Sequence, residues 1–163
     1  MRRDLTTAAI GGGIGGLLDC IYATVLWGFI LGDNPAGVWQ SVAAGLLGKE
    51  AAYAGGDATA ILGLMLHFGI AIVMGLVYVR ASRRLPLLVA RPLLMGALYG
   101  VGLYLVMNFV VVPLSAIGFR PPSLAGALRA LIPHILFVGP AIALTAARRN
   151  GDAQVGTKSL LEA

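Results

Sequence analysis

The stretch LTTAAIGGGIGGLLDCIYATVLWGFILG, residues 5–32, decides the fold of this chain. Its only charged residue is Asp19, and the residues around that carboxylate are mostly apolar or small. Because about 20 consecutive apolar residues suffice to cross the hydrocarbon core of a bilayer, the stretch predicts a membrane-spanning helix. A carboxylate is costly in hydrocarbon, so Asp19 is expected to face protein or water, and it marks a candidate functional site.

The composition of the whole chain also favours a membrane protein. Hydrophobic residues make up 58% and charged residues 12% of the 163 residues, whereas about 25% of the residues in an average soluble domain are charged. Several spans leave no length for a second domain, so we predict one integral membrane domain with short loops. The net charge of +5 lies mostly in short segments beside apolar runs, which indicates membrane topology and not nucleic-acid binding.

Four apolar segments have the length of a membrane span. We predict helices at residues 8–31, 58–79, 92–117 and 124–147. The predicted fold class is therefore all-α: an integral membrane bundle of four transmembrane helices in a domain of residues 1–149. The polar tail, residues 150–163, is predicted to be a disordered cytoplasmic segment.

The first loop, residues 32–57, is too long for a simple turn. Apolar residues recur in it near helical spacing, with Trp39 at one end; they are Val38, Val42, Leu46 and Leu47. This pattern predicts a short helix that lies at the membrane interface.

The distribution of basic residues predicts the orientation of the bundle. One side collects nine of them: Arg2, Arg3, Arg80, Arg83, Arg84, Arg91, Arg148, Arg149 and Lys158. The other side has Lys49, Arg120 and Arg129. Both termini are therefore expected to be cytoplasmic. Arg129 falls about one turn inside the fourth segment, so it must extend its side chain outward or pair with a carboxylate.

Glycines are concentrated on two of the predicted helices. They are Gly11, Gly12, Gly13, Gly15 and Gly16 in the first span, and Gly96 and Gly100 in the third. Small residues at this spacing let helix backbones approach closely in a bilayer. The glycine-rich faces therefore predict either tight packing inside one bundle, or assembly into a homo-oligomer or a larger membrane complex.

Each predicted span also carries one strongly polar side chain. Asp19, His67 and His134 fall about 14 to 17 Å from the membrane surface at 1.5 Å per helical residue, close to the midplane. Asn108 in the third span lies nearer the outer face. Tyr22 and Tyr104 stand one turn from Asp19 and Asn108, on the same helix faces, as possible supporting residues. The predicted buried polar site is Asp19, His67, Asn108 and His134.

Three interpretations of this site are open. It is a hydrogen-bond network that holds the helices in register. Alternatively, Asp19 and a histidine form a relay for protons or cations, since histidine changes charge near neutral pH. As a third reading, His67 and His134 coordinate haem or a metal, although the chain has neither a CxxCH nor an HExxH motif and no cofactor is predicted.

Prolines interrupt the third and fourth spans. Pro133 and Pro140 flank His134, and each removes a backbone hydrogen bond, so carbonyl groups beside the histidine are expected to be free to line a cavity or bind a cation. Pro113 is expected to kink the third span near its outer end.

Several short motifs resemble those of a group of small, largely uncharacterised four-helix bacterial inner-membrane proteins, loosely similar to the YagU-like proteins. The motifs are Leu66-His67-Phe68, Leu85-Pro86, Gly96 to Gly100, Met107-Asn108 with Val112-Pro113-Leu114-Ser115, and Pro133-His134. The resemblance implies a multi-pass protein of the bacterial cytoplasmic (inner) membrane, and it implies no particular chemistry.

Enzymatic activity is not expected. The sequence shows no nucleophile and base at catalytic spacing, no glycine-rich phosphate loop and no paired carboxylates in the spans. Two functional classes remain. The polar midplane residues favour proton or small-solute handling in the lipid bilayer, whereas the small size and glycine-rich faces favour an accessory subunit of a larger complex.

Overall fold

The structure, a computed structural model, describes residues 1–119 and 121–149. Every regular element in these residues is a helix, and four helices are long and apolar enough to cross a membrane: Arg2–Ile30, Gly56–Ser82, Pro92–Leu114 and Leu124–Arg149. The all-helical fold with four such helices is thereby confirmed. The tail predicted to be disordered, residues 150–163, lies outside the described residues, as do Arg120 and Lys158.

Three of the four long helices contain π-helical turns. The first joins α1 (Arg2–Ala23) to η1 (Thr24–Ile30), the second is α4 (Gly56–Ser82), and the third joins α6 (Pro92–Val106), η2 (Met107–Val111) and α7 (Val112–Leu114). The fourth begins with α8 (Leu124–Pro133) and η3 (His134–Val138) and continues to Arg149. Prolines explain two of these turns, since Pro113 follows η2 and Pro133 precedes η3, and each lacks the backbone N–H that a regular helix needs.

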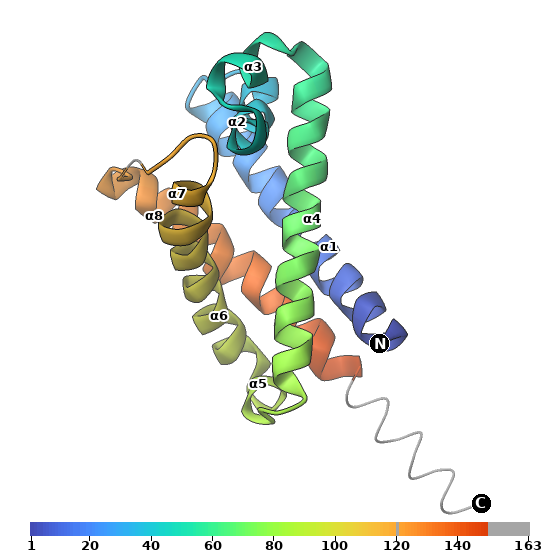
Figure 1. The fold of residues 1–163 in the computed structure, drawn as a ribbon. Helices are drawn as coiled ribbons and strands as arrows, with labels where there is room; N and C mark the ends of the chain where they lie inside the picture. The colour runs from blue at the N-terminus through green and yellow to red at the C-terminus, as the bar shows by residue number, and fades with distance from the viewer. Residues whose placement is uncertain (120, 150–163) are drawn as a thin grey trace, which may run out of the picture.

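The first loop contains the short helix that the sequence predicts. In α2 (Pro35–Leu47) the Asn34 side chain accepts a hydrogen bond of 3.0 Å from the Ala36 backbone N–H at the first turn. Gly48, with φ of +79°, ends α2, and α3 (Lys49–Ala54) follows. In Figure 1 α2 is seen nearly end-on beside the upright α4, so the two helices cross steeply. A side chain at Gly63 of α4 would collide with the Trp39 carbonyl of α2, which places the crossing point there.

The two ends of the bundle differ in charge and in composition. The N-terminus, the turn with α5 (Leu87–Ala90) and the final residues of the fourth helix lie together at one end (Figure 1). This basic end carries Arg3, Arg80, Arg83, Arg84, Arg91, Arg148 and Arg149. The opposite end carries α2 and α3, and it is called the α2 end below. A backbone hydrogen bond of 2.9 Å from Ala116 to the Gly45 carbonyl ties the segment after α7 to α2.

Glycines close the helix seams towards the basic end. A Cβ on Gly75 of α4 would lie 2.8 Å from the Ala8 carbonyl oxygen of α1, and one on Gly15 would lie 3.0 Å from the Cα of Val138. Gly12 packs as closely on Ala71 of α4. The glycines at 11, 16, 96 and 100 likewise meet other helices of the same chain. These contacts support the interpretation that the glycine-rich faces pack within one bundle.

Candidate functional site

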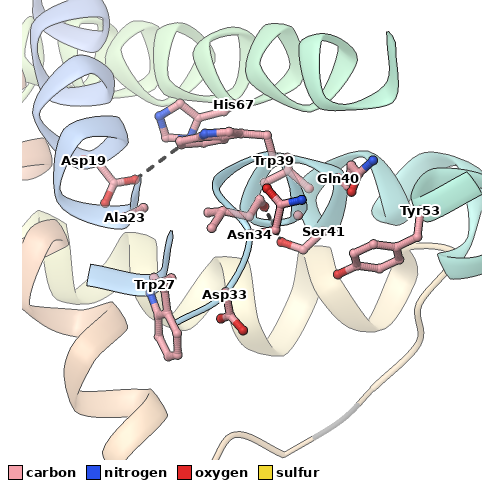
Figure 2. A pocket seen from close by; sticks show the side chains of 13 residues that line it. Asp19, Ala23, Trp27, Asp33, Asn34, Trp39, Gln40, Ser41, Tyr53 and His67 are labelled. Atoms are coloured by element: carbon pink, nitrogen blue, oxygen red, sulfur yellow. Dashed lines mark hydrogen bonds and ion pairs between the residues drawn. The ribbon is translucent and has the colours of Figure 1, made fainter. Parts of the chain in front are cut away.

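A cavity of about 520 Å³ opens at the α2 end of the bundle. The end of the first helix, the turn after it, α2, α3 and α4 all contribute to its wall (Figure 2). The lining residues are Asp19, Ala23, Trp27, Asp33, Asn34, Gly37, Val38, Trp39, Gln40, Ser41, Val42, Tyr53 and His67. Its volume falls in the range of about 300 to 1,000 Å³ that small-molecule sites occupy.

Asp19 of α1 and His67 of α4 face each other in the wall of this cavity (Figure 2). The Asp19 Oδ2 atom lies 3.9 Å from the His67 Nδ1 atom, and their side chains are 17% and 15% exposed. The distance is too long for a direct hydrogen bond, but it suits an ion pair or a bridging water. The two groups are thus partly desolvated and still reachable from the cavity.

The backbone of α1 fixes the tautomer of His67. Its Nε2 atom lies 2.9 Å from the Gly16 carbonyl oxygen, which can only accept, so Nε2 carries the proton. The second ring nitrogen, Nδ1, is therefore the one that gains or loses a proton opposite Asp19. Edge contacts with Trp39 and Phe68, at centroid distances of 5.2 and 5.3 Å, hold the ring in this orientation. The pair consequently offers two sites for one exchangeable proton, Nδ1 and the carboxylate.

His134 lies in the fourth helix, at the start of η3. The His134 Nδ1 atom donates to the Ala130 carbonyl of its own helix at 2.8 Å, and its ring meets Tyr104 edge-on at 6.3 Å. His134 is absent from the residues that line the cavity. His134 therefore bonds to its own helix and stands apart from the cavity wall.

Tyr22 connects the first helix to the fourth. Its hydroxyl donates a hydrogen bond of 3.0 Å to the Arg129 carbonyl. In a regular helix that carbonyl would accept from residue 133, but Pro133 has no N–H to give. The carbonyl that proline leaves free is therefore occupied by a tyrosine and takes no part in the cavity. Tyr22 supports the packing of the fourth helix, where its ring also meets Phe137 edge-on.

Asn108 is not brought into the site. Its side-chain nitrogen donates to the Tyr104 carbonyl of the same helix at 2.9 Å. The predicted set of four polar residues thus divides, since Asp19 and His67 meet, whereas His134 and Asn108 each bond to a backbone carbonyl of their own helix. Depth along a helix sets the height of a side chain in the bundle, but the direction in which it points depends on helix rotation.

Several cavity residues were not among the predicted site residues. Trp27, Asp33, Asn34, Gln40 and Tyr53 come from the end of the first helix and from the first loop. The periodic pattern beside Trp39 did predict a helix there, but not that this helix would cross α4 above Asp19 and His67. Tertiary packing of α2 on Gly63 thus adds most of the wall.

Arg129 and the possible metal ligands have defined surroundings. The Arg129 guanidinium lies over the Trp27 ring, 5.8 Å from its centroid, so in the described structure an indole is its neighbour and not a carboxylate. Within the described residues, no group of three or more His, Cys, Asp or Glu side chains is placed to hold a metal ion. One ring nitrogen of each histidine bonds a backbone carbonyl, and His67 lines the cavity whereas His134 does not.

Comparison of the chain with protein-family models, with curated proteins and with solved structures finds no match. The similarity to small inner-membrane proteins therefore stays a prediction from short motifs, and the site's own geometry carries the functional argument.

Proposed function

We propose that this chain is a multi-pass protein of the bacterial inner membrane that handles protons at the Asp19–His67 pair. The basic end faces the cytoplasm in this proposal, because positively charged residues are retained on that side. The cavity then opens towards the opposite side of the membrane. Both termini are cytoplasmic in this arrangement.

The observation that carries the proposal is the fixed tautomer of His67. With Nε2 committed to the Gly16 carbonyl, the only titratable nitrogen points at a carboxylate 3.9 Å away. A pair that served only to stabilise the fold would be more stable with its two side chains in direct hydrogen-bond contact. A separation that admits one water, beside an open cavity, suits uptake and release of a proton.

The packing below the pair supports access from one side. Gly12 and Gly15 bring α1 into backbone contact with α4 and with the fourth helix immediately towards the basic end. The buried residues beyond them are mainly apolar or aromatic: Tyr78, Val79, Leu103, Val138, Ile142, Ala143 and Ala146. Protons therefore reach the pair from the α2 end in this conformation.

Intrinsic fluorescence tests the proposal directly. The chain has two tryptophans, and both Trp27 and Trp39 line the cavity. Because Trp39 touches His67 and a protonated imidazole quenches indole emission on contact, we expect emission of the purified protein to fall as the pair is protonated. Asp19→Asn should shift this titration towards lower pH by removing the anion that stabilises the imidazolium, and His67→Ala should abolish it. The exposed Asp57→Asn on α4 is the matched control.

Reconstituted vesicles with an internal pH dye provide the functional readout. We expect proton movement or proton-coupled solute movement in the wild type and in Asp57→Asn, and its loss in Asp19→Asn and His67→Ala. Titration curves and fluxes that are the same in all four proteins would reject the proposal.

A groove between α4 and α6 favours the accessory-subunit alternative. It has a volume of about 650 Å³ and an almost wholly apolar lining, and Gly69 and Gly102 face open space there. Such a groove suits a helix of a larger complex. This alternative predicts co-purification with other membrane proteins in mild detergent, and a monodisperse preparation without companions would contradict it.

A further inference from the structure

We infer that the cavity binds a small organic cation with an ammonium group, which takes the place of the proton at Asp19. The inference rests on the proposed function, since it names what is exchanged for the proton at the same pair. It is carried by the aromatic residues, the hydrogen-bonding groups and the charges of the cavity wall.

Aromatic rings and carboxylates occur together in the wall. Trp27 and Trp39 lie on opposite sides of the cavity in Figure 2. The carboxylates of Asp19 and Asp33 belong to the same wall. Ammonium groups are attracted to the faces of indole rings and to carboxylates. Trp27 already accepts a cation, since the Arg129 guanidinium lies over its ring at 5.8 Å.

Two polar side chains of α2 in the wall donate to backbone carbonyls of the protein itself. The Gln40 side-chain nitrogen donates to the Gly56 carbonyl at 3.0 Å, and the Ser41 hydroxyl donates to the Val38 carbonyl at 2.6 Å. The carboxylates can only accept when ionised. The two carboxylates of the wall, Asp19 and Asp33, therefore suit a ligand that donates hydrogen bonds or carries positive charge.

The charges around the cavity balance with one bound cation. No lysine or arginine belongs to its described lining, and Arg129 is the guanidinium that contacts a lining residue. With His67 neutral, the carboxylates of Asp19 and Asp33 leave one negative charge against Arg129. A proton on the Asp19–His67 pair or one ammonium ion restores neutrality equally well. The other titratable groups near the pair are Cys20 beside Asp19, His134 of the fourth helix and Tyr53 of α3.

Size separates an organic cation from a metal ion. The cavity of about 520 Å³ is far larger than a dehydrated alkali or alkaline-earth ion requires. Such ions also need about six oxygen ligands at short range. Because the wall offers indole rings where a metal ion would need oxygen ligands, it favours an ammonium ion that carries apolar substituents.

Fluorescence of Trp27 and Trp39 in the purified full chain tests the inference. Choline and ethanolammonium are titrated at constant ionic strength, with sodium chloride and the neutral carbon isostere of choline as controls. We expect a saturable emission change with at least one of the two cations and none with either control. Asp19→Asn should weaken binding at least about tenfold, the loss typical of a paired charge, while Asp57→Asn leaves it unchanged. Where the pair is protonated, the Kd should rise about tenfold for each pH unit of acidification, because one proton is displaced.

The outcomes separate this inference from the proposed function. A pH titration of emission that depends on Asp19, without a saturable effect of either cation, overturns the cation site and leaves proton handling intact. Saturable binding of a cation that is independent of pH overturns the exchange with the proton. Asp33→Asn, an exposed change at the cavity wall that does not threaten the fold, provides a second variant and should weaken binding less than Asp19→Asn.

Discussion

The half of the bundle towards the basic end and the half towards the α2 end are built from different residues. The first is closed by glycines and alanines that bring backbones together, as at Gly12 and Gly75. The second contains the π-helical segments η1 and η2, the crossing helix α2 and a cavity with carboxylates and indole rings. The Asp19–His67 pair lies between the two halves. Small residues therefore seal one side of the pair, and bulky residues keep the other side open.

The difference shows how one short chain combines tight packing with an accessible polar site. In the membrane setting that we propose there is no hydrophobic force between helices, so close backbone contact has to hold them together. The basic half supplies that contact. This allows the α2 half to use irregular turns, which tend to occur at functional sites in helices.

The largest expected effect on stability comes from substituting one of two adjacent glycines in α1. Gly12 packs on Ala71 of α4, whereas a side chain at Gly13 would meet nothing within 4 Å. We expect Gly12→Ala to destabilise the protein by about 3 kcal/mol, because added atoms cannot be accommodated against a backbone. Gly13→Ala should be neutral or slightly stabilising, since alanine is the better helix former. Thermal unfolding in detergent measures the stability of both variants. Equal stabilities would show that α1 and α4 are not in close backbone contact at Gly12.

Two serines allow the water accessibility of the two halves to be compared. Ser41 is exposed in α2 and Ser82 is buried at the end of α4, and each donates to the carbonyl three residues earlier. In a Cys20→Ala background, Ser41→Cys should react with a water-soluble thiol reagent at least about 100-fold faster than Ser82→Cys, a difference of about 2.7 kcal/mol in the opening required. Comparable rates would mean that both halves admit water.

The sequence predicted the helices better than it predicted the site. Apolar length was enough to locate all four long helices, because hydropathy depends on composition and not on neighbours. The helix rotations that bring Asp19 to His67 and turn Asn108 to its own backbone follow from glycine contacts between distant segments, such as Gly12 with Ala71. Those pairings are not encoded in any single local pattern. The cavity also needed the position of α2, which Gly63 determines.

A smaller effect on stability is expected for Tyr22, whose hydroxyl takes the place of a missing backbone donor. Tyr22→Phe should cost about 1 to 2 kcal/mol, because the Arg129 carbonyl then loses its partner inside the bundle. In a Pro133→Ala background the restored backbone N–H can bond that carbonyl, so the same change should cost clearly less. A double-mutant cycle from detergent unfolding measures the coupling. Full additivity of the two changes would contradict the link between Tyr22 and Pro133.

The smallest expected effect lies at the basic end, where the Arg83 guanidinium donates to the Asp4 carboxylate and joins α4 to α1. The Arg83 side chain is 57% exposed and the Asp4 side chain 10%, so solvent screens the pair from one side only. We expect Arg83→Gln to destabilise the protein by no more than about 1 kcal/mol, with a loss that shrinks as salt is added. Arg84→Gln, a neighbouring exposed arginine, is the matched control. A larger, salt-independent loss for Arg83 would mean that charge, and not only close backbone contact, holds the basic half closed.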